Sequence, residues 1–186
     1  MKPVLVGAAL TAVALLEAAI PALAASAEPE VDATCVRTLH GTFDGPAAPG
    51  RGNASQADTL HMTGTLTCVD PAGKPLAAGT VDHTVSLPRT ECTADEHGDT
   101  SATRVTWADG AVSTFGFEHT DVVKADGTAS LVAAGGVTSD SARFAGDTLH
   151  GVGTGVSTGC GSSAAARKVA STMVLRLTHR PRPAVG

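Results

Sequence analysis

The chain has 186 residues, of which 17% are charged, and its formal net charge is −5. It lacks the surplus of Lys and Arg that would form a basic face for phosphates, so we expect no nucleic-acid partner. Without the leader described next, 159 of the 186 residues remain, which is enough for one domain with its own core.

Residues 1–27 have the features of a secretory signal peptide. A positive charge at Lys2 precedes the uncharged apolar run Val4–Leu16, and small residues lead up to position 27. Such a segment offers an apolar helix to the translocon and an extended cleavage site to the peptidase. The alternative is a membrane anchor, but a spanning helix needs about 20 apolar residues, and this run is shorter. We therefore expect a secreted, extracellular protein with no membrane segment in its mature form.

The rest of the chain alternates apolar and polar residues in eight segments bounded by Gly, Pro or Asp, which is the pattern of half-buried strands. The predicted strands are Thr34–Phe43, Thr59–Val69, Leu76–Leu87, Ser101–Trp107, Ala111–Lys124, Thr128–Thr138, Thr148–Thr158 and Lys168–His179. Turn dipeptides such as Asp109-Gly110 join several of them as hairpins.

Eight consecutive strands joined mostly by short turns predict an all-β fold, an antiparallel meander of about eight strands. A meander that closes has no exposed edge, so we predict a small barrel, with a two-sheet β-sandwich as the alternative. Residues 28–179 then form a single disulfide-stapled domain. Residues 180–186 form a loose C-terminal tail, because Pro181 and Pro183 cannot extend a sheet interior.

All four cysteines, Cys35, Cys68, Cys92 and Cys160, follow the leader, and an even number in an exported chain predicts two disulfides. The alternative, a cysteine metal site, is disfavoured because no pair has C-x-x-C spacing. In an up-and-down barrel, successive strands end at alternate poles. Cys35 and Cys68 then share one pole while Cys92 and Cys160 share the other, which predicts the pairings Cys35–Cys68 and Cys92–Cys160.

Two of the seven histidines fall on apolar faces of predicted strands. His83 alternates with valines, and His119 alternates with phenylalanines and with Asp121. We predict a small-ligand site inside the barrel, formed by His83, Trp107, His119 and Asp121. The alternatives are a weak zinc or copper site and a plain hydrogen bond in which Asp121 satisfies His119.

One pentapeptide, residues 155–159, matches the G-x-S-x-G pattern of a nucleophile elbow. That motif needs a turn between a strand and a helix, whereas here it ends a Gly-rich β segment. We therefore predict no catalytic role for Ser157 and assign no catalytic residue in the chain.

In its leader, size and β pattern, the chain resembles the small exported β-proteins of high-GC actinomycetes. The segment Thr65–Gly73, which contains Cys68 and Pro71, is also similar to the stretch around a disulfide cysteine in the Streptomyces subtilisin inhibitor family. This second resemblance implies a secreted protease inhibitor. The chain departs from that family because its next cysteine, Cys92, does not follow closely.

The leading hypothesis is a secreted, non-enzymatic binding or protein-interaction domain, because no catalytic constellation stands out within a stapled frame. The expected partner is another exported protein, a cell-wall component or a small ligand, and no cofactor is expected. Two alternatives remain open. One is a small barrel enzyme, of isomerase or cyclase type, that uses interior His and Asp residues as acid or base. The other is the protease inhibitor.

Overall fold

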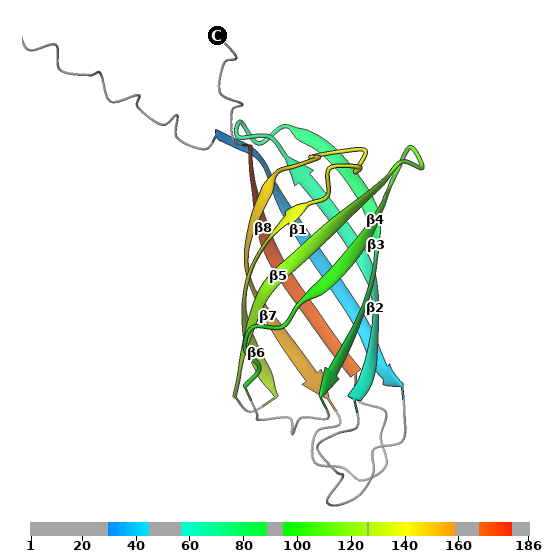
Figure 1. The fold of residues 1–186 in the computed structure, drawn as a ribbon, viewed down its shortest axis with the longest axis vertical. Coiled ribbons are helices and arrows are strands. Elements are labelled where there is room, and N and C mark those ends of the chain that lie inside the picture. The colour runs from blue at the N-terminus through cyan, green and yellow to red at the C-terminus, as the bar shows by residue number, and fades with distance from the viewer. Residues whose placement is uncertain (1–29, 45–56, 89–94, 126, 159–167, 180–186) are drawn as a thin grey trace, which may run out of the picture.

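The computed structural model describes residues 30–44, 57–88, 95–125, 127–158 and 168–179. In it, each strand pairs with its neighbours in sequence and β8 pairs with β1, so the sheet closes into an antiparallel barrel (Figure 1). The strands are β1 (Glu30–Asp44), β2 (Ala57–Val69), β3 (Pro75–Pro88), β4 (Ser101–Trp107), β5 (Val112–Ala125), β6 (Thr128–Val137), β7 (Thr148–Thr158) and β8 (Lys168–His179). The predicted all-β meander and its closure into a barrel are confirmed.

The core of the protein is the interior of the barrel, the lumen. Successive side chains of a strand point to opposite faces, so alternate residues of each strand enter the lumen. The largest fully buried apolar side chains are Leu39, Leu66, Val105, Phe115, Leu149, Met173, Leu175 and Leu177. They come from six of the eight strands and form one hydrophobic cluster.

One end of the barrel, where β1 begins and β8 ends, is filled by aromatic rings; we call it the closed end. Trp107 lies 2% exposed there, and its Nε1–H donates to Ser113 Oγ at 2.8 Å. Phe144, in the connection between β6 and β7, meets the Trp107 ring edge-on at a centroid distance of 5.8 Å. Its φ of 58° is a left-handed backbone that non-glycine residues rarely adopt. The connection thus folds its ring inward over the lumen.

The disulfide Cys35–Cys68 lies near the closed end and is confirmed. The two cysteines face each other across the β1–β2 pairing, and the bond joins Cα atoms 4.0 Å apart. Cys92 and Cys160 lie outside the described residues, as do the leader (residues 1–27) and the tail (residues 180–186). The pairing Cys92–Cys160 therefore stays a prediction.

A β-bulge in β5 changes which of its side chains enter the lumen. The pairing with β6 shifts register between Phe117 and His119. Up to Phe117 the odd-numbered residues are buried, whereas beyond the bulge Val122 lines the lumen and Val123 is 51% exposed. One extra residue in the strand reverses the alternation for everything that follows it.

Candidate functional site

The half of the lumen away from the closed end is hollow. We call this end, where β1 ends and β8 begins, the open end. The cavity has a volume of about 160 Å³. Its wall is mostly apolar, and the larger apolar residues in it are Leu39, Leu60, Met62, Val85, Phe117, Val122, Leu131, Val156, Val169 and Met173. An apolar cavity with a few polar groups is the usual form of a small-molecule site.

The cavity exists because three consecutive strands place small residues in its wall. These are Ala129 and Ala133 on β6, Gly155 on β7 and Ser171 on β8. Nearer the closed end, Gly151 also points inward, but there the space is taken. A Cβ at that position would lie 2.7 Å from both Leu175 Cδ2 and Met173 Sδ. A glycine therefore makes room for a neighbouring side chain in one half, while in the other half the small residues leave open space.

Arg37 extends from β1 into this cavity and is only 6% exposed. Its Nη1 donates to Thr103 Oγ1 at 3.4 Å, and its Nη2 donates to Met173 Sδ at 3.6 Å, a weak acceptor. The guanidinium carbon lies 4.8 Å from the centroid of the Phe117 ring, and Nε has no hydrogen-bond partner. Among the described residues no carboxylate forms an ion pair with Arg37.

The burial of Arg37 affects both the pKa and the solvation of its guanidinium. Burial lowers the pKa of its guanidinium to about 10, so the group remains protonated at neutral pH. A buried charge without a counter-ion is unfavourable by several kcal/mol, because the protein does not replace the solvation that water gave. The structure therefore contains a fixed positive charge that faces an apolar cavity.

His83 stands beside Arg37, linked to it through Thr103. The Thr103 hydroxyl oxygen accepts from Arg37, so its own proton is available to His83 Nδ1, which lies 2.8 Å away. Burial lowers the pKa of His83 to about 4, and the charge of Arg37 contributes to the shift. The imidazole is therefore neutral at neutral pH, and Arg37 is the only cationic member of this group of three.

The rim of the cavity is polar. Lys124 forms an ion pair with Glu96, and a two-residue bridge joins the backbones of Glu96 and Val122. Asp99 also lines the cavity; burial, and then the nearby Glu96 carboxylate, raises its pKa above the usual range. The bulge in β5 is what turns Lys124 inward to this rim. A ligand would thus pass charged groups before reaching the apolar wall.

The structure separates the four residues predicted to bind a ligand. Only His83 lines the cavity. Trp107 is buried in the closed end. His119 and Asp121 lie on the outer surface, with side chains 55% and 34% exposed, so their predicted place in the lumen is wrong. The physical reason is the bulge after Phe117, because the sequence pattern assumes uninterrupted alternation.

Outside the barrel, Asp121 is satisfied by its neighbours. Its Oδ2 lies 3.0 Å from His119 Nε2, and its Oδ1 accepts the Gly98 N–H at 3.2 Å and lies 3.2 Å from His97 Nδ1. The hydrogen bond with His119 lowers the pKa of Asp121 most. This is the plain hydrogen bond that the sequence left as an alternative. A lumenal acid–base pair of His83 with His119 or Asp121 does not form.

Arg37 is not among the residues predicted from the sequence to bind a ligand, although the chain carries a signal for it. In β1 the inward positions read Cys35, Arg37 and Leu39, so one charged residue interrupts an otherwise apolar face. A long charged side chain at an inward position of a closed barrel has no nearby route to solvent. A charged residue on an apolar strand face is therefore a sequence signal for a site in the lumen, as the histidines are.

Comparisons with protein-family models, with curated proteins and with solved structures found no match to this chain. In the ranges that the structure describes there is no helix long and apolar enough to cross a bilayer. The role of the cavity is therefore inferred from its own chemistry.

Proposed function

We propose that the protein binds a small amphiphilic anion in the cavity, with an acid group against Arg37 and an apolar body along the wall. The observation that carries this proposal is the buried guanidinium of Arg37, which faces the cavity and has no carboxylate partner among the described residues. This is the small-ligand form of a non-enzymatic binding domain. The protease-inhibitor alternative depends on the resemblance of the stretch Thr65–Gly73, which contains Cys68, and it stays a prediction.

The donors of Arg37 are suited to an acid group. A guanidinium offers five N–H donors in a planar fork that matches both oxygens of a carboxylate. Here one donor reaches a hydroxyl at 3.4 Å and another reaches a thioether at 3.6 Å, while Nε–H is unused. An anion therefore finds donors that the protein itself leaves weakly bonded or unbonded. The low dielectric of the lumen strengthens such a contact.

The wall suits the rest of the ligand. Met62, Leu131 and Val169 line the cavity from three different strands, and each methylene group buried against such a wall contributes about 0.8 kcal/mol. Affinity should rise with the length of an alkyl chain until the cavity is full. Methionines adapt their shape readily, so the wall tolerates some variety in the apolar body.

Calorimetry with octanoate and octanol, at neutral pH, tests the proposal. The two probes share an alkyl chain and differ in charge. We expect octanoate to bind about 10-fold to 100-fold more tightly, the range for a hydrogen bond to a charged group. Arg37→Met should abolish this preference. Arg176→Met is the matched control, because Arg176 is exposed on the outer face of β8, and it should keep the preference.

Three results would contradict the proposal. They are no binding of octanoate, equal binding of octanol, and an unchanged octanoate preference in Arg37→Met. The melting temperature of Arg37→Met without ligand shows whether this variant folds. The substitution removes a buried charge that has no carboxylate partner among the described residues, so it should not lower the melting temperature and is expected to raise it.

A further inference from the structure

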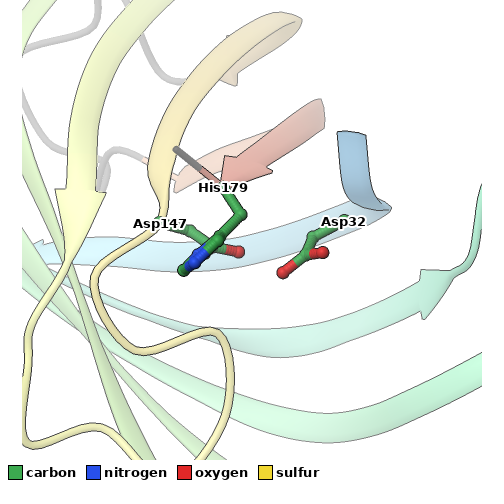
Figure 2. Close-up of side chains that lie close together, drawn as sticks. All are labelled: Asp32, Asp147 and His179. Atoms are coloured by element: carbon green, nitrogen blue, oxygen red, sulfur yellow. The ribbon is translucent and has the colours of Figure 1, made fainter. Parts of the chain in front are cut away.

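A second polar cluster lies at the closed end of the barrel, away from the cavity. It contains Asp32, Asp147 and His179 (Figure 2). Asp32 comes from the start of β1, Asp147 immediately precedes β7, and His179 ends β8. One ligand atom from each residue lies within 4.8 Å of the other two. His179 Nδ1 is 2.9 Å from Asp147 Oδ1, and the carboxylate of Asp32 is turned toward this pair in Figure 2.

The fold holds these residues in place from the backbone. In the pairing of β1 with β8, Val31 lies opposite Thr178 and Ala33 opposite Leu177, so Asp32 is the extra residue of a bulge. Bulges re-aim a side chain, and this one turns Asp32 toward the cluster. The main chain of Asp147 is fixed on both sides, because its N–H donates to Phe144 O at 3.1 Å and its carbonyl accepts from Val137 N–H at 2.8 Å.

Asp147 carries an unsatisfied oxygen into this cluster. The residue is 2% exposed, and its Oδ2 is buried with no hydrogen-bond partner. A buried acceptor without a donor is unfavourable by about 1–3 kcal/mol, and more when it is charged. Burial raises the pKa of Asp147, the hydrogen bond with His179 opposes the rise, and the charge of Asp32 adds to it. The hydrogen bond between the side chains of Asp32 and Asp147 raises the pKa of Asp147 as well. A cation placed among Asp32, Asp147 and His179 would satisfy both converging carboxylates.

We propose that Asp32, Asp147 and His179 bind a divalent transition-metal ion, and that zinc fits the site best. An imidazole ligand disfavours magnesium and calcium, whereas imidazole together with carboxylates is a usual zinc set. Tetrahedral zinc with bonds of about 2.0–2.1 Å holds its ligand atoms roughly 3.3 Å apart. The Nδ1–Oδ1 contact of 2.9 Å needs only a small opening. Asp32 is exposed and therefore has room to move in.

Binding requires one exchange of protons. The ring proton of His179 moves through solvent from Nδ1 to Nε2, which leaves the Nδ1 lone pair for the metal, and the metal takes the place of that proton between Nδ1 and Asp147 Oδ1. Water occupies the fourth position. Such an ion would join the first residues of β1 to the last residue of β8, where the pairing of these two strands closes the barrel. Its expected role is to stabilise that closure, since a ligand that binds only the folded state favours folding.

The competing zinc site is the exposed group of His97, His119 and Asp121 on the outer surface. There the two imidazoles contact different oxygens of Asp121, so neither oxygen of this carboxylate is buried without a partner. Any test of the proposal must therefore distinguish the two places.

Titration of the metal-free protein with zinc chloride at pH 7, followed by calorimetry, makes that distinction. We expect one zinc ion per chain and a higher melting temperature when zinc is bound. His179→Gln and Asp32→Asn should each weaken binding about 10-fold to 100-fold. His150→Gln is the matched control, since His150 is exposed on β7, and His119→Gln probes the competing site. Both should bind zinc as the unaltered protein does.

Unchanged zinc affinity in His179→Gln, or a loss of affinity in His119→Gln, would overturn the proposal. Anomalous diffraction at the zinc edge from crystals of the unaltered protein serves if a variant does not fold. A peak between Asp32, Asp147 and His179 supports the proposal. A peak only elsewhere, or no peak, refutes it.

Discussion

The two halves of the barrel share the same eight strands and the same alternation, yet one half is solid and the other hollow. Toward the closed end the inward residues are large, or they are small and covered by large neighbours, as Gly151 is covered by Leu175. Toward the open end, small residues such as Ala129 and Gly155 stand in the wall. The backbone pattern sets the barrel, and the size of the inward side chains decides where the barrel is filled.

The unfavourable features of the two halves differ as well. The closed end has the aromatic contacts of Trp107, the disulfide and a well-packed core. Among its described residues, the buried side-chain atoms without a hydrogen-bond partner are Arg143 Nε and Asp147 Oδ2. The open end has the guanidinium of Arg37, which forms no ion pair with any described residue, beside empty space. Rigid packing in one half can support an unfavourable arrangement in the other. Substitutions in each half can test this contrast between a packed half and a hollow half.

The largest contrast should come from matched Leu→Ala substitutions. Leu175 is fully buried in the packed half, so Leu175→Ala should cost about 3–5 kcal/mol of unfolding free energy. Leu131 is partly buried and borders the cavity, so Leu131→Ala should cost only about 1–2 kcal/mol, because the contacts that it loses are fewer. Urea unfolding measures both. Equal costs would show that the cavity is closed in solution and that the two halves do not differ.

A second prediction concerns the disulfide. The bond Cys35–Cys68 closes a loop with a sequence separation of 33 residues, for which chain entropy gives a contribution on the order of 4 kcal/mol. The double variant Cys35→Ala/Cys68→Ala should lose about that much stability in urea unfolding. Its affinity for octanoate should be unchanged, because the cavity lies in the other half. A parallel loss of octanoate affinity would show that the two ends are coupled.

The third and smallest effect is a pH dependence that originates at the open end. The pKa of His83 in the folded protein is about 4, below its ordinary value of 6.5. Between these values the unfolded chain binds more protons, so stability falls as the pH drops from 6.5 toward 4. At pH 4.5 His83 should account for a loss of about 2–3 kcal/mol relative to pH 7.

Comparison of variants isolates this contribution. His83→Gln should flatten the pH profile of the unfolding free energy by that amount, whereas His150→Gln, at an exposed position, should leave the profile as it is. If both variants retain the full profile, His83 titrates normally in the folded protein, and Arg37 and Thr103 do not hold it neutral.

The fold was readable from the sequence because period-two alternation persists through every strand and turn residues mark their ends. The disulfide Cys35–Cys68 was also predictable, because successive strands of a meander end at alternate poles of the barrel. That argument depends only on the order of the strands. The site was less readable. The bulge after Phe117 depends on how β5 pairs with β6, and no local sequence pattern predicts it. The predicted alternation therefore put His119 and Asp121 on the wrong face of the strand.

The remaining features depend on closure of the barrel. Arg37 was visible as a charge on an apolar face, but its lack of a partner depends on which side chains the lumen gathers around it. The cluster at the closed end unites positions 32, 147 and 179. These come together only when the first and last strands pair, so spacing along the chain gives no hint of them.

The pairing of β1 with β8 also constrains when the protein can fold. Glu30 pairs with His179, so the barrel cannot close until the last strand of the chain is present. Contacts between residues so far apart in sequence form slowly, because the entropy of the intervening loop must be overcome first. Until β8 docks, the edges of β1 and β7 expose unpaired backbone groups to other chains. The interval before closure is therefore when this protein is most prone to aggregate, and any factor that speeds the docking of β8 shortens it.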